Sequence, residues 1–162
     1  MKKTVIFLML IILIFSCEGS KPLVKAQQNS FPAIVNDYSK IFTQSQRDSL
    51  VKKILQYEKL TTNEIAIVTL DSIDGEIKFY GTNLANQIGV GKKDKDNGLL
   101  ILLVKSLRKV NISTGLGTEK ILTDAICQVI IDTKMIPEFK KGNFYKGIDN
   151  ALDEIILKWK NE

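Results

Sequence analysis

Residues 89–104, GVGKKDKDNGLLILLV, join a polar loop directly to a buried strand. The first ten residues hold three glycines, three lysines, two aspartates and one asparagine. Residues 99–104 are entirely apolar and predict a strand that is buried on both faces. A loop with carboxylates and backbone freedom, attached to a rigid strand, is a common way to build a binding site. We therefore expect the functional site of this chain in or beside this loop.

Helix and strand patterns alternate on both sides of this stretch. Four segments have apolar residues at helical spacing: 44–59, 76–88, 124–135 and 145–158. Two further segments have strand patterns: 64–70 and 109–114. The last of these follows the 99–104 strand so closely that the pair must form an antiparallel hairpin. This order predicts an α/β fold, a three-layer α/β/α sandwich with a small mixed sheet that contains a β-hairpin.

The N-terminus has the pattern of an exported bacterial lipoprotein. Lys2 and Lys3 precede an uncharged apolar run over residues 5–15, and Ser16-Cys17 follows. We predict a signal peptide over residues 1–16, lipidation of Cys17, a polar tether over 17–30 and one domain over 31–162. Secretion with cleavage nearby, or a retained anchor, are the alternatives. The expected location is the cell envelope, with the lipid in the membrane and the domain facing the periplasm or the exterior.

Composition excludes several classes of function. The chain of 162 residues carries a formal charge of +5, and removal of Lys2 and Lys3 lowers this to +3, which is too mild to indicate nucleic-acid binding. It has no histidine, which excludes Ser-His-Asp and Cys-His catalysis and ordinary catalytic zinc sites. Cys127 lies in an apolar pattern and is expected to be a core residue. Any metal must therefore bind to oxygen ligands, which favours Ca²⁺ or Mg²⁺.

The hairpin predicts which polar side chains lie together. Gly98 precedes its first strand and Gly115 follows its second, so the two glycine-containing loops meet at one end. Five side chains with oxygen donors fall there and form a candidate metal-binding rim: Asp94, Asp96, Asn97, Glu119 and Asp124. Asp37 is either a local turn former or an outlying ligand of the same site.

Two familiar motifs do not match this loop. Counted from Asp94 as an EF-hand, position 6 is Leu99 and position 12 is Lys105, where glycine and glutamate are needed. Residues 89–93 lack the first glycine and the Ser/Thr of a phosphate-binding loop, and they precede a strand instead of a helix. The sequence therefore favours a divalent cation over a nucleotide.

An ordered series of motifs runs from about residue 32 onward: residues 35–37 (VND), 64–70, 89–91 (GVG), 95–100 (KDNGLL), 108–110, 115–117 (GLG) with Glu119, 122–124 (LTD), 136–139 and 142–147 (GNFYKG). In this series the chain resembles the TPM-domain family, which comprises bacterial secreted and membrane-anchored proteins and a chloroplast-lumen protein of photosystem repair.

The resemblance implies an α/β/α sandwich with calcium or another divalent metal at an acidic rim. By motif, the rim positions are Asp37, Asp96, Glu119 and Asp124, whereas Asp94 stands where the family often has a small residue. Many members continue into a transmembrane segment and a Gly-rich tail. This sequence ends at Glu162, and we expect a lipid anchor to replace that segment.

The family includes members with reported acid-phosphatase activity, so two hypotheses remain. The first is a monomeric calcium-binding interaction or repair-type module that recognises an unknown protein partner in the envelope. The second is a metal-assisted phosphomonoesterase that uses Asp96 or Asp124, with metal-activated water or an aspartyl phosphate in place of a histidine or cysteine nucleophile.

Overall fold

The computed structural model describes residues 34–160, so the predicted signal peptide, Cys17 and most of the tether lie outside the described range. None of the helices formed by these residues is long and apolar enough to cross a membrane. In chain order the elements are β1 (Val35–Asp37), α1 (Gln44–Thr61), β2 (Glu64–Leu70), α2 (Ile77–Ile88), β3 (Gly98–Val104), β4 (Lys109–Thr114), α3 (Leu116–Glu119), α4 (Asp124–Ile130), the π-helix η1 (Ile131–Met135), α5 (Ile136–Phe139) and α6 (Phe144–Trp159).

The described strands form one mixed sheet in the order β1-β2-β3-β4. β1, β2 and β3 are parallel, and β4 is antiparallel to β3, which confirms the predicted hairpin. The sequence predicted three strands, and the fourth is β1, which pairs with residues 67–69 of β2. Three residues are too few to show the two-residue alternation of a strand, so sequence patterns did not detect it.

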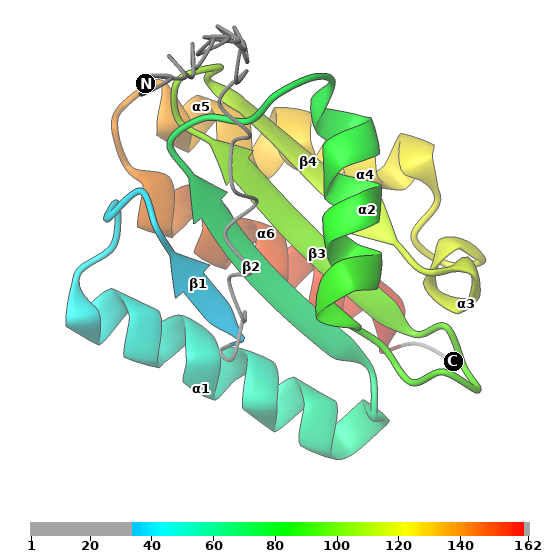
Figure 1. Ribbon diagram of the computed structural model, residues 1–162. Coiled ribbons are helices and arrows are strands. Elements are labelled where there is room, and N and C mark those ends of the chain that lie inside the picture. The colour runs from blue at the N-terminus through cyan, green and yellow to red at the C-terminus, as the bar shows by residue number, and fades with distance from the viewer. Residues whose placement is uncertain (1–33, 161–162) are drawn as a thin grey trace, which may run out of the picture.

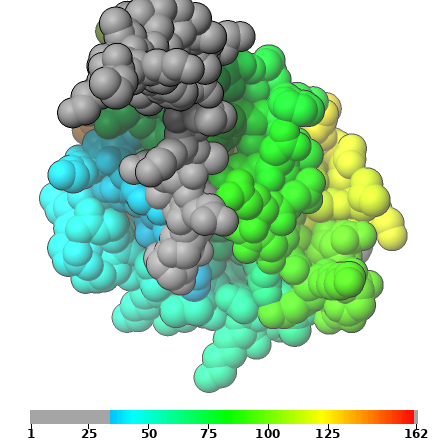
Figure 2. Space-filling view, in the orientation of Figure 1, coloured from blue at the N-terminus to red at the C-terminus, as the bar shows by residue number. Residues whose placement is uncertain are grey.

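Helices cover both faces of the sheet, which confirms the three-layer arrangement (Figure 1). One set of alternate residues, including Ile65 and Leu99, packs in a core with α1, α4 and α6. The other set, including Val68 and Leu100, packs against α2. α2 forms the green ridge at the centre of the space-filling view (Figure 2).

The two parallel crossovers have opposite hands. β1, β2 and β3 follow one another in space, yet α1 lies on one face of the sheet and α2 on the other. Two crossovers that move in the same direction on opposite faces cannot both be right-handed, the hand that such connections adopt in about 98% of cases. The chains leaving β1 and β2 therefore separate toward opposite faces at the carboxyl ends of these strands.

Local sequence signals explain where the helices begin and end. Thr43 and Gln46 form the predicted capping box at the start of α1. α2 ends at Gly89, whose φ of 69° is a left-handed conformation that glycine adopts without steric cost. The segment predicted as one helix over 124–135 begins as α4 but changes to a π-helix over η1, and α5 then begins at Ile136 with Pro137 in its first turn.

Candidate functional site

The hairpin brings the two glycine-containing loops together, as the sequence predicts. The Gly115 amide donates to the Gly98 carbonyl at 2.9 Å, and the Gly117 amide donates to the Asp96 carbonyl at 3.1 Å. Thr118 Oγ1 donates to the Gly98 carbonyl at 3.0 Å. We call residues 91–98 and 115–119 the loop pair; its first loop projects at the lower right of Figures 1 and 2. Main-chain contacts therefore hold the two halves of the candidate site.

Two glycines make this close approach possible. A Cβ atom on Gly117 would lie 2.0 Å from the Lys95 carbonyl oxygen, and one on Gly115 would lie 2.3 Å from that of Asp96. Both distances are far below van der Waals contact, so any larger residue must push the loops apart. The glycines identified in the sequence thus serve packing between the loops.

Asn97 fixes the first loop to the end of α1. Its side-chain oxygen accepts the Lys92 amide at 2.8 Å. Its side-chain nitrogen donates to the Thr62 carbonyl and to Asn63 Oδ1, both at 3.0 Å. Asn97 is buried, and its amide oxygen is already engaged with the backbone. We conclude that Asn97 supports the loop and is poorly placed to bind a ligand.

Glu64 is a second support that the sequence analysis did not single out. Its carboxylate accepts the Gly91 amide at 2.7 Å and forms an ion pair with Lys92. The contact between the Lys92 ammonium group, which donates, and the Glu64 carboxylate raises the pKa of Lys92. The detectable signal was a glutamate at the first position of a strand, and this strand begins beside the loop.

The predicted ligand residues differ in whether their carboxylates are paired with other side chains. Asp94, Asp96 and Glu119 are exposed on the loop pair, and within residues 34–160 their carboxylates have neither a hydrogen bond nor an ion pair. Asp124 lies in the first turn of α4 and pairs with Lys78 of α2 at 2.5 Å, which raises the pKa of Lys78. Three carboxylates therefore remain available on the loop pair, and a fourth is engaged nearby.

Asp37 lies at the opposite end of the sheet from the loop pair. It pairs with Thr69 at the carboxyl end of β2, whereas Gly98 pairs with Glu64 at the amino end. Its side chain is 1% exposed and contacts Arg47 at 3.4 Å. The structure thus shows Asp37 as a turn former and does not bring it to the rim.

The hydrogen bonds of Asp37 explain this position. Its Oδ1 accepts from Thr69 Oγ1 at 2.6 Å and from the Ile41 amide at 3.1 Å, and its Oδ2 accepts from the Phe42 amide at 2.9 Å. Both oxygens therefore order the connection between β1 and α1.

The donor set of the rim does not form a closed metal cage. Among residues 34–160, no three carboxylate or thiolate side chains lie close enough together to hold a metal ion. Ca²⁺ takes six to eight oxygen ligands, so main-chain carbonyls and water would have to supply most of them. The residues present fit a weak, hydrated site better than a tight structural one.

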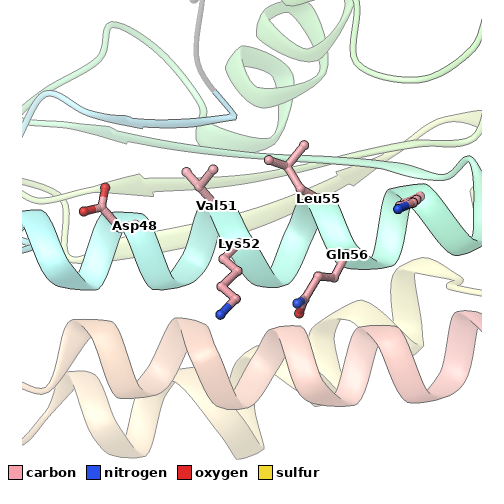
Figure 3. Close-up of a pocket in the computed structure, with 6 residues that line it drawn as sticks. Asp48, Val51, Lys52, Leu55 and Gln56 are labelled. Atoms are coloured by element: carbon pink, nitrogen blue, oxygen red, sulfur yellow. The ribbon is translucent and has the colours of Figure 1, made fainter.

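Two cavities are relevant to binding. A cleft of about 630 Å³ lies beside the loop pair and is lined by residues of α1, both loops and α6. A groove of about 430 Å³ runs along α1, where Val51 and Leu55 point toward the strands while the exposed Lys52 and Gln56 point the other way (Figure 3). All lining residues of this groove come from α1, whereas the cleft is lined by residues from several elements.

Comparisons with known proteins agree with this fold. A family model described as a TPM domain matches residues 35–158. The solution NMR structure of the N-terminal domain of a P. gingivalis protein is similar, with 31% identity and a TM-score of 0.71, over 76% of this chain and 80% of that one. No curated protein matches.

Two other solved structures share the fold at lower identity. The N-terminal domain of the cg2496 protein from Corynebacterium glutamicum has 17% identity and a TM-score of 0.63, over 80% of this chain and 81% of that one. The BA42 protein of the psychrophilic bacterium Bizionia argentinensis has 18% identity and a TM-score of 0.66, over 76% and 89%. From the family match over most of its described length, we conclude that this chain belongs to the TPM-domain family.

Proposed function

We propose that this protein is a lipid-anchored TPM module of the cell envelope whose loop pair binds a divalent cation and presents a surface to a protein partner. The observation that carries this proposal is that main-chain hydrogen bonds join two loops that each carry exposed carboxylates. Asp94, Asp96 and Glu119 then project from a fixed frame without competing partners within the described residues.

Calcium suits this donor set better than magnesium. Ca²⁺ accepts irregular oxygen geometry, whereas Mg²⁺ requires a near-ideal octahedron. Asp94, Asp96 and Glu119 would supply carboxylate oxygens, and the bound cation would supply charge neutralisation between the two loops. Without a preformed cage, we expect affinity in the range of extracellular modules, with a dissociation constant of about 0.1–1 mM.

A calcium titration followed by amide NMR tests the site. Residues 34–160 contain both cores, so the chain from residue 18 onward retains the whole described fold. We expect saturable shifts at 91–98 and 115–119 that disappear when Asp96→Asn and Glu119→Gln are combined. Asp74→Asn, an exposed carboxylate outside the loop pair, serves as the matched control and should leave them unchanged. Equal shifts around every surface carboxylate would refute a specific site.

The proposed location in the cell envelope rests on the N-terminal sequence. A basic start, an apolar run and Ser16-Cys17 together have the pattern of a lipoprotein signal. Metabolic labelling with palmitate should mark the wild-type chain and not Cys17→Ser. Release of the wild-type protein into the soluble fraction would instead favour simple secretion.

The alternative is metal-assisted hydrolysis of phosphomonoesters, and it draws its support from the family resemblance. Burial raises the pKa of Cys127 to about 11, so its thiol is not an available nucleophile at neutral pH. Hydrolysis would then depend on Asp96 or on Asp124, whose carboxylate is paired with Lys78. Turnover of p-nitrophenyl phosphate that survives Asp96→Asn combined with Asp124→Asn would exclude both residues as the source of activity.

A further inference from the structure

The cleft beside the loop pair combines apolar and basic side chains. It lies where α1 and α6 both end, and its large apolar lining residues are Leu60, Ile121 and Trp159. Trp159 is 5% exposed and packs against Tyr57, with 5.8 Å between the ring centres. Leu60 is 75% exposed, so its side chain can lose contact with water when a ligand binds.

The charged residues in the cleft are all basic. Lys95 and Lys160 line it, and none of its lining residues is acidic. Lys95 Nζ donates to Thr62 Oγ1 at 2.9 Å, which holds the ammonium group at the end of α1. Within residues 34–160, neither lysine forms an ion pair. The cleft therefore offers two positive charges beside an apolar surface.

The cleft is formed before any ligand arrives. Asn97 ties its loop to the end of α1, and Gly117 packs directly on the Lys95 carbonyl. A rigid, preformed site loses less conformational entropy on binding than a flexible one. Its volume of about 630 Å³ also lies within the common range of small-molecule and peptide sites.

The helix ends at this cleft oppose a doubly charged phosphate more strongly than a singly charged anion. α1 and α6 direct their carboxyl ends, which carry partial negative charge, toward this region. Phosphates bind preferentially at helix amino ends, where the partial charge is positive. Two ammonium groups can balance one carboxylate in this setting, whereas a dianion would meet more repulsion.

We propose that this cleft binds the C-terminal residue of a peptide or protein that ends in an apolar side chain. The terminal carboxylate lies between Lys95 and Lys160, and the side chain packs on Leu60, Ile121 and the edge of Trp159. This site goes beyond the proposed cation site and does not require it, because its charged groups are lysines.

Two small probes test the proposal directly. N-acetyl-leucine carries the carboxylate and the apolar side chain, and N-acetyl-leucinamide is its neutral analogue. Trp159 is the only tryptophan in the chain, so its fluorescence reports on the cleft. We expect saturable binding of the acid at about 1–10 mM, accompanied by amide shifts at Asn63 and Gly117. The amide should bind about tenfold more weakly.

Variants separate a specific site from general charge effects. Lys95→Gln and Lys160→Gln should each weaken the acid about two- to fivefold and leave the amide unchanged. Lys93→Gln, in the same loop but outside the cleft lining, should bind both probes as the wild type does. All titrations contain EGTA, so failure of the cation site does not affect the result.

Two outcomes would overturn the proposal. Equal binding of acid and amide would show that the lysines do not recognise a carboxylate. Absence of both the fluorescence change and the two amide shifts at about 50 mM probe, well above the affinity expected for a ligand of this size, would show that the cleft is not a binding site.

Discussion

Replacing Gly117 by alanine should destabilise the protein, although helix propensity predicts the opposite. Gly117 lies inside α3, where alanine is favoured over glycine by about 1 kcal/mol. The structure places the new Cβ atom 2.0 Å from the Lys95 carbonyl oxygen, so the two loops must move apart. Such overpacking costs about 1–3 kcal/mol, and weakening the Gly117–Asp96 hydrogen bond adds about 1 kcal/mol. The expected net loss is therefore about 1–3 kcal/mol.

Urea unfolding of the wild type and Gly117→Ala measures this difference, with amide NMR of Asp96 and Gly98 as a local reading. Gly75→Ala is the control, because no atom lies within 4 Å of its Cβ position and only its φ of +89° opposes the change. That variant should lose about 1 kcal/mol from backbone strain alone and leave the loop shifts unchanged. A Gly117→Ala protein as stable as the wild type, with wild-type shifts at Asp96, would refute the argument from close approach.

Three further predictions concern residues away from the loop pair. Asp37→Asn should lower the free energy of unfolding in urea by about 2 kcal/mol, because a buried carboxylate with several donors, including Arg47, loses its charge. Calcium-induced shifts in the loop pair should not change in this variant, and their loss would place Asp37 in the cation site. Cys127 should resist a thiol reagent at pH 8 in the folded protein and react fully in urea, since burial raises its pKa to about 11; rapid labelling of the folded chain would show that this part of the core opens readily. Glu76 has a lowered pKa because backbone amides of Lys78 and Phe79 donate to its carboxylate. Its contribution to stability is therefore present above its unfolded pKa and is lost as the pH falls through the folded value. Glu76→Gln should remove part of the acid dependence of unfolding below about pH 4.5, and an unchanged pH profile would contradict this.

The sequence predicted the layers because its strongest signals are local and regular. The apolar run of β3 and the capping box of α1 specify their elements without tertiary context. The short connection after β3 also fixed the hairpin and, with it, the meeting of the two loops. The strand β1 gave no such signal, because its identity depends on pairing with residues far along the chain.

The sequence predicted where the two loops meet better than which side chains lie there. Asp96 and Glu119 lie on joined loops because antiparallel pairing dictates it. Asp37 matched a family motif, but motif order does not reveal which end of a strand faces the site. Asn97 and Glu64 bind the backbone, a role that depends on side-chain direction in three dimensions. A sequence shows which donors are present, and the fold determines which of them remain available.

Main-chain hydrogen bonds between the two loops fix their conformation without the exposed carboxylate side chains. Gly98, Gly115 and Asp96 hold the loops through main-chain atoms, so the side chain at Asp96 takes no part in this joint. Positions 94 and 119 can therefore exchange one side chain for another while the frame beneath them stays the same, whereas the φ of 49° at Asp96 favours aspartate, asparagine or glycine there. This protein thus has a surface whose exposed side chains can change, by evolution or by design, without refolding the domain that supports it.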